Sequence, residues 1–372
     1  MAMRHIAIAL GLVVSWPALP AAAGIIHRRG DLGPIEAPII SMDDAGVVVR
    51  TPGGASQTVA WDVVRDIEPD VPDLNLPERL ARAAEMWRAR ARLQRNDAAL
   101  AEPLFERLFE RYRGKTGESA LIVAEGLLRC RLARGAHDAA VIPFLEMARM
   151  RRAGAATDRY AALTPVYDDT WSLCPQLAPV WAGAAGLDKL QRDLESFDAQ
   201  GDAVVAAVAA LYARAARAQA SGPVALADAP PPELPHHEGA AFLASLLDVM
   251  SADSARRSAA RGRLAGQLPS LPPWAEAWAR HVIGLSLLAE SGIELKRRGM
   301  VSLAHVPARF GASQPYLAAL ASLRLADALS ASGRLEEAAA IRADARRRFP
   351  GHPVFLLNEP EPGPSDRIKE NA

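Results

Sequence analysis

A His-His-Glu run at residues 236–238 is the part of the chain that most readily suggests metal chemistry. Two imidazoles and a carboxylate are ligands that zinc and copper accept. Adjacent residues point in different directions, however, whereas a helical metal pair needs ligands three or four positions apart. Glu238 also falls at an expected helix start, where the positive end of the helix stabilises a carboxylate. We therefore interpret His236, His237 and Glu238 as a capping region and predict no metal site and no cofactor.

Three acidic residues in the middle of the chain could do acid–base chemistry. Asp168 and Asp169 lie between Tyr167 and Trp171, and Glu195 follows later. Such a group could hold a sugar or a cation, and two carboxylates roughly 5 to 10 Å apart could hydrolyse a glycan. The alternative is a solvated loop with the two aromatic rings tucked beneath it. We assign no catalytic residue and keep a glycan hydrolase as an alternative function.

The remaining reactive residue types have no recognisable setting. The chain has no Gly-x-Ser-x-Gly elbow, no His-Glu-x-x-His motif and no phosphate-binding glycine loop. Trp274 and Trp278 are one helical turn apart, a spacing typical of core packing. Cys130 and Cys174 could pair in an oxidising compartment, but Cys130 stands among apolar helix positions where a buried thiol is equally ordinary. Pairing of these cysteines stays open.

The first 23 residues have the pattern of a secretory signal peptide. Arg4 supplies a basic start, residues 6–14 an apolar run, and residues 17–23 a stretch that ends on small residues. We predict cleavage between Ala23 and Gly24. An uncleaved anchor is the alternative, but the apolar run is far shorter than the roughly 20 residues that cross a bilayer. The protein is therefore expected to be exported, periplasmic or secreted, without a membrane span after cleavage.

The charge balance gives no case for nucleic-acid binding. Lys and Arg number 43, and so do Asp and Glu. Loss of Arg4 with the signal peptide would leave a formal charge of −1, whereas a nucleic-acid partner needs a basic face. Half of the residues are hydrophobic, and the many alanines among them favour closely packed helices.

A change of periodicity near residue 70 divides the chain. Residues 24–71 predict a small β-module, and this module loosely resembles an SH3-like barrel. Its predicted strands are Ile35–Ile40, Val47–Arg50, Gln57–Trp61 and a short one near Ile67. So short a module rarely buries enough area to be stable alone, so we expect it to dock on the following helices.

Residues 72–357 predict a helical domain. Leu104, Phe105, Leu108, Phe109 and Tyr112 recur at the spacing of an amphipathic helix. Further helices are predicted at Asp188–Phe197 and Asp202–Ala220, and from about Glu238, Ser254, Trp274 and Leu295. For residues 167–181 we predict a loop that contains a short helix. Residues 221–237 are expected to form a Pro-rich loop, and residues 358–372 a disordered tail.

One helix-turn-helix pattern stands out near the end of the chain. It consists of Leu325, Ala326, Leu329, Gly333, Leu335, Ala338, Ala345 and Pro350. Over residues 316–352 this pattern resembles a tetratricopeptide repeat, in which small residues such as Ala326 and Ala338 face each other across the pair. The spacing around Gly135 and Ala140 repeats it within residues 118–152, and a weaker copy turns at Asn96-Asp97 before Ala101. Ser322 and Arg342 depart from the bulky and aromatic residues usual in that family.

The resemblance implies a mainly α fold, a tetratricopeptide-like α-helical repeat solenoid preceded by the β-module. Stacked pairs of that kind form an extended surface for other proteins. The predicted function is therefore a protein–protein interaction scaffold that binds a protein or peptide partner in the cell envelope. A purely structural envelope component is a further alternative.

Overall fold

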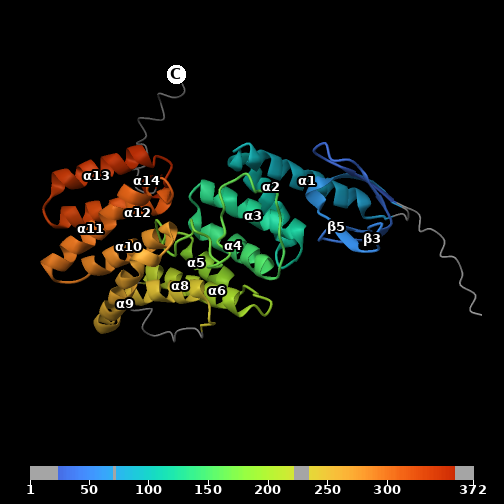
Figure 1. Cartoon of the computed structure of the whole chain (residues 1–372). Coiled ribbons are helices and arrows are strands. Elements are labelled where there is room, and N and C mark those ends of the chain that lie inside the picture. The colour runs from blue at the N-terminus through green and yellow to red at the C-terminus, as the bar shows by residue number, and fades with distance from the viewer. Residues whose placement is uncertain (1–23, 70–72, 222–233, 357–372) are drawn as a thin grey trace, which may run out of the picture.

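The computed structural model describes residues 24–69, 73–221 and 234–356, and over these ranges the protein is mainly helical. Two small antiparallel sheets lie at the N-terminal end (Figure 1). The predicted signal peptide, the central part of the Pro-rich loop and the tail at 358–372 lie outside the described residues. None of the described helices combines the length and the apolar character that a bilayer crossing requires.

The β-module consists of two three-stranded sheets, ordered β2-β1-β6 and β3-β4-β5. The strands are β1 (Gly24–Arg28), β2 (Ile35–Ala37), β3 (Ile39–Met42), β4 (Val47–Arg50), β5 (Ser56–Val59) and β6 (Val64–Glu68). The predicted strand at 47–50 is confirmed, and the one at 35–40 is split at Pro38, where the chain leaves one sheet for the other. Proline cannot donate a ladder hydrogen bond, so a break at this residue is expected.

The predicted strand at 57–61 is wrong at its end, because β5 stops at Val59 and Trp61 begins the 3₁₀ turn η1 (Trp61–Val63). The indole Nε1 of Trp61 donates a hydrogen bond to the backbone oxygen of Asp43 at 2.6 Å. Its backbone N–H donates to Oγ of Ser119, 3.0 Å away. These two bonds turn the segment away from the sheet ladder and toward the helices.

Thirteen helices are described. They are α1 (Leu76–Gln94), α2 (Ala98–Tyr112), α3 (Glu118–Ala133), α4 (His137–Arg152), α5 (Leu187–Glu195), α6 (Ala203–Ser221), α8 (Glu238–Val249), α9 (Ser254–Gln267), α10 (Pro273–Leu288), α11 (Ile293–Phe310), α12 (Pro315–Ala331), α13 (Leu335–Arg348) and the single turn α14 (Pro353–Leu356). The predicted helices all appear, except the short one within residues 167–181. That segment forms turns closed by an isolated bridge between Asp168 and Leu173.

The same turn joins three of the helix pairs, α1–α2, α3–α4 and α12–α13. Its central residue has a left-handed backbone, with φ of 62° at Asn96, 77° at Gly135 and 82° at Gly333. Glycine and asparagine tolerate this conformation best. In each turn the next N–H bonds back to a carbonyl five residues earlier, at distances of 2.9 to 3.0 Å. This is the bond that closes a Schellman cap.

An alanine follows each of these turns at the same position, five residues after the left-handed residue. The three are Ala101, Ala140 and Ala338, and none has any exposed surface. Twelve residues earlier, the first helix of two of the pairs carries Ala89 and Ala326, which are equally buried. Small side chains at these positions let the two helices of a pair approach closely.

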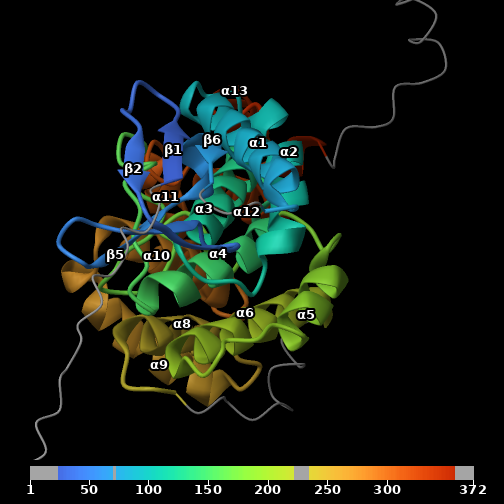
Figure 2. The same cartoon turned by 90° about the vertical axis from the view of Figure 1, so that its right-hand side faces the viewer.

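The helices form two stacks joined by a middle region. Helices α1–α4 make one stack, α10–α13 the other, and α5, α6, α8 and α9 lie beneath and between them (Figures 1 and 2). Successive helices contact each other throughout each stack. Gly284 and Gly299 bring α10 and α11 close together, since a Cβ on Gly299 would lie 2.9 Å from the oxygen of Gly284.

A buried ion-pair cluster docks the β-module on the first stack. The carboxylate of Asp62 has no exposed surface and lies 2.9 Å from Nε of Arg90 on α1 and 3.0 Å from Nε of Arg159 after α4. Burial raises the pKa of Asp62, and the two guanidinium groups oppose that effect. Ser119 adds a second link, because its hydroxyl donates to the oxygen of Ala45 at 2.8 Å. The module is therefore held by α1, α3 and the segment after α4.

Replacement of Asp62 should destabilise the whole protein. We expect Asp62→Ala to lower the free energy of unfolding by about 3 to 5 kcal/mol, because it leaves buried Arg90 without its counter-charge. Urea denaturation followed by circular dichroism measures the change. Asp169→Ala, at an exposed loop position, is the control and should change stability by no more than about 0.5 kcal/mol. Equal stability of the two variants would contradict the docking role of Asp62.

A larger side chain between the two helices of the last pair should also destabilise the protein. We expect Ala338→Leu to lower the free energy of unfolding by about 1 to 3 kcal/mol, because the fully buried position has no room for a larger side chain. Ala339→Leu places the same side chain on an exposed neighbour in the same helix. If the two variants have the same midpoint of thermal denaturation, the result contradicts the close packing of α12 against α13 at Ala338.

Candidate functional site

The His-His-Glu run caps a helix. His237 is the residue preceding α8, and its Nδ1 accepts a hydrogen bond from the N–H of Gly239 at 3.2 Å. Its Nε2 lies 3.2 Å from Oγ of Ser172. Both ring nitrogens are thus engaged within the protein, as the capping interpretation predicts. No group of three His, Cys, Asp or Glu side chains within the described ranges is placed to hold a metal ion.

Asp168 organises the loop in which it lies. Its Oδ1 accepts hydrogen bonds from the N–H groups of Thr170 and Trp171, and its Oδ2 accepts one from the indole of Trp274 at 3.2 Å. Asp169 points into solvent. The carboxylate of Asp168 therefore fixes a turn against α10 and uses its lone pairs in doing so.

The aromatic residues near Asp168 form a packed cluster. Trp171, Phe242, Trp274 and Trp278 meet at ring-centroid distances of 4.9 to 6.2 Å, mostly edge to face. Such edge-on contacts stabilise aromatic cores. Trp274 and Trp278 are buried, so the packing interpretation of their spacing is confirmed. A shallow cavity of about 380 Å³ opens beside Trp171 and Phe242.

The other candidates are separated from this loop. Glu195 lies at the end of α5, where its carboxylate is 3.8 Å from the guanidinium of Arg217, and it lines a different cavity, between α5 and α6. Cys130 and Cys174 are buried and unpaired. Burial raises the pKa of each thiol to about 12, so neither is a ready nucleophile near neutral pH.

A groove of about 460 Å³ lies over the last helix pair, between α12, α13 and α14. Leu320, Leu323 and Phe355 supply its apolar lining. Asp327 holds two of the rim arginines, Arg342 at 2.9 Å and Arg324 at 3.8 Å. Arg346 stacks over the ring of Phe355. Arg342, which departs from the tetratricopeptide pattern, thus extends to the rim of the groove and does not fill the space between the helices.

The two helix stacks meet at a cluster of three rings that the sequence analysis missed. His137, at the start of α4, stacks on Tyr316, at the start of α12, with centroids 3.5 Å apart and planes inclined by 14°. His352 lies 4.6 Å from the same tyrosine ring. The hydroxyl of Tyr316 accepts a hydrogen bond from the N–H of Ala182 at 2.9 Å. We call these three residues the stack joint.

A glycine also shapes the stack joint. A Cβ on Gly135 would lie 2.7 Å from Cδ of Pro353, so this glycine serves both the turn before α4 and the contact with α14. A cavity of about 310 Å³ opens beside this contact, lined in part by Arg134 and Asp138. No local pattern marks the joint in the sequence, because its members come from three separate segments.

The buried histidines should make the protein sensitive to acid. Burial lowers the pKa of His137 and of His352 to about 4. The unfolded chain, with a pKa near 6.5, therefore binds protons more readily than the folded one. The stabilising contribution is complete above about pH 6.5 and is lost as the pH falls toward 4 and below, by at most about 3 kcal/mol per histidine.

Denaturation in urea at several pH values between 7.5 and 4 measures this loss. We expect the double variant His137→Asn/His352→Asn to lose less stability between pH 6.5 and 4 than the native chain, even though it starts from a lower value at pH 7.5. His236→Asn, in the loop before α8, is the control and should follow the native profile. If the free energy of unfolding of the double variant falls as steeply with pH as that of the native chain, protonation of His137 and His352 does not cause the loss of stability.

Comparison with protein-family models, with curated proteins and with solved structures found no match to this chain. Function must therefore be argued from the chain's own geometry.

Proposed function

We propose that this protein is an exported scaffold of tetratricopeptide-like helix pairs that binds a protein or peptide partner in the cell envelope. The observation that carries the proposal is the threefold use of one helix pair. Pairs α1–α2, α3–α4 and α12–α13 share the left-handed turn and the buried alanine behind it. Repetition of one pair is the principle by which helical-repeat proteins build binding surfaces. The signal-like sequence of the first 23 residues supports export.

The groove over α12 and α13 is the surface we assign to the partner. Ion pairs of Asp327 with Arg324 and Arg342 link the side chains of its charged rim. A preformed surface loses less conformational freedom when a partner binds. Three arginines against one aspartate also favour a partner segment that carries carboxylates and an apolar side chain for Leu320 and Leu323.

The hydrolase alternative gains no support from the described geometry. Asp168 is held by Trp274, Asp169 is solvated, and Glu195 pairs with Arg217 across a different cavity. General acid–base catalysis by two carboxylates requires them to face one substrate bond. A protein that only binds a partner needs no such pair of carboxylates, and the groove over α12 and α13 offers it a surface.

Crosslinking in the native cell envelope tests the proposal. The bait is the mature chain from Gly24, and its partners are identified after affinity capture. We expect the groove variant Leu323→Asp/Arg346→Glu to lose the partners that the native chain captures reproducibly, because it introduces charge on the apolar lining and reverses the rim.

The matched control is Leu335→Asp/Arg347→Glu. It makes the same two chemical changes at exposed positions of α13 that do not line the groove. Circular dichroism must show that both variants fold. Partners retained by the groove variant, or lost equally in the control, would reject this groove as the binding surface. Absence of any specific partner would favour the purely structural role.

A further inference from the structure

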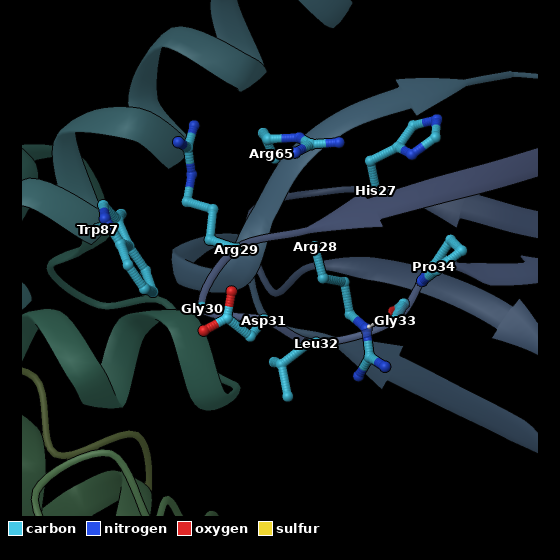
Figure 3. A pocket seen from close by; sticks show the side chains of 10 residues that line it. All are labelled: His27, Arg28, Arg29, Gly30, Asp31, Leu32, Gly33, Pro34, Arg65 and Trp87. Atoms are coloured by element: carbon cyan, nitrogen blue, oxygen red, sulfur yellow. Dashed lines mark hydrogen bonds between the residues drawn. The ribbon is translucent and has the colours of Figure 1, made fainter.

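A pocket of about 540 Å³ lies on the β-module (Figure 3). Figure 1 shows this module at the opposite side of the molecule from α12 and α13. The loop between β1 and β2, residues 29–34, forms one wall. Arg65 on β6 and Trp87 on α1 form the others, and Arg28, the last residue of β1, also lines the pocket. Three segments of the chain thus line one hollow with arginine side chains and an indole ring. In Figure 3 the Arg28 side chain runs toward Gly33, and the side chains of Arg29 and Arg65 lie on the other side of the loop.

The pocket has an excess of positive charge. Among its lining residues Asp31 is the one carboxylate, against Arg28, Arg29 and Arg65. Arg88 lies close enough to Arg29 to repel it. Neither Arg65 nor Arg88 forms a hydrogen bond or ion pair that the structure records with any residue in the described ranges. The protein as a whole carries equal numbers of acidic and basic side chains, so the pocket is more basic than the chain average.

Many arginines elsewhere in this protein lie beside carboxylates. Arg134 lies 2.7 Å from Glu102, and Arg257 and Arg261 share Glu290 at 3.1 and 2.9 Å. Pairing of this kind limits repulsion between like charges. Arg65 and Arg88 have no such carboxylate partner among the described residues.

Two of the pocket arginines are anchored in a way that leaves their outer nitrogens available. Nε of Arg28 donates to the oxygen of Gly33 at 2.7 Å, and Nε of Arg29 donates to the oxygen of Val64 at 3.2 Å. No acceptor for their terminal nitrogens is recorded among the described residues. A guanidinium fixed through Nε keeps the two terminal N–H groups that grip an oxyanion.

Repulsion between the arginines of this pocket also affects the pKa of Arg29. Burial, followed by the charges of Arg65 and Arg88, lowers the pKa of Arg29. The guanidinium nonetheless remains charged at neutral pH, because arginine is protonated throughout the physiological range. An anion bound among these groups would relieve their mutual repulsion.

The indole of Trp87 forms a fixed wall of the pocket. A Cβ on Gly30 would lie 3.1 Å from the ring, and Gly30 has φ of 74°, so only glycine suits this close approach. The guanidinium of Arg90, itself held by Asp62, lies 4.7 Å from the centre of the same ring. The position of Trp87 is thus tied to the ion-pair cluster that docks the β-module.

We propose that this pocket binds the phosphate group of an anionic ligand. Arginine forks match the paired oxygens of a phosphate, and several arginines against one aspartate suit a group that carries up to two negative charges. The phosphate could belong to a soluble phosphate ester or to a lipid headgroup, since both present the same oxygens. The site does not depend on the function proposed for the groove.

Titration calorimetry with inorganic phosphate tests the site directly. The full mature chain is titrated at constant ionic strength, with sodium chloride as the reference salt. We expect saturable binding to the native chain and at least about tenfold weaker binding to Arg65→Gln/Arg88→Gln. Both side chains are exposed and unpaired among the described residues, so this variant should fold like the native chain.

Arg297→Gln/Arg347→Gln is the matched control. It removes two exposed helical arginines elsewhere and should bind phosphate as the native chain does. No saturable binding to the native chain, or equal loss in the two double variants, would overturn the proposal.

Two further ligands distinguish the source of the phosphate. Glycerol phosphate represents a soluble ester, and vesicles containing phosphatidylglycerol, compared with phosphatidylcholine alone, represent an anionic lipid surface. Tighter binding to one of them that is lost in Arg65→Gln/Arg88→Gln assigns that source. Binding to either ligand that is as tight in this variant as in the native chain would contradict the proposal.

Discussion

The buried carboxylate of Asp62 is the interaction on which the N-terminal half of this structure depends. A charge without exposed surface is tolerated only when opposite charges compensate its lost hydration. Arg90 and Arg159 supply that compensation from α1 and from the segment after α4. One short turn of the β-module is therefore tied to two parts of the helical domain. A module of this size gains from the helices the burial that it cannot provide by itself.

The helical domain depends on a simpler constraint, the close approach of paired helices. A left-handed residue ends the first helix, and a buried alanine five positions later accepts the neighbouring helix. The middle region lacks this pattern. It is held instead by the packing of Trp171 and Phe242 against Trp274 of α10 and by the bonds of Asp168 and His237. Two kinds of packing thus alternate along the chain, repeated pairs at both ends and a specific cluster between them.

Features set by local physics could be predicted from the sequence. The turns at Gly135 and Gly333, the burial of Ala140 and Ala338, and the strand at 47–50 each follow from residue type and spacing within a few positions. The capping role of His237 was predictable for the same reason. The contact between Asp62 and Arg159 joins residues 97 positions apart, and no periodic pattern encodes such a pair. The stack joint and the arginine pocket likewise consist of residues from separate segments, so neither could be predicted before the fold was known.

The stack joint is a direct contact between the first helix stack and the stack that carries the groove. A chain of helix pairs linked only through neighbours can flex along its length, because each pair contacts the next and nothing else. Here Tyr316 on α12 packs against His137 on α4, and Ala182 and His352 contact the same tyrosine. The joint thereby closes a path from the first stack through the middle region to the second. With Asp62 holding the β-module to the first stack, the arginine pocket and the groove over α12 and α13 are carried on one connected framework.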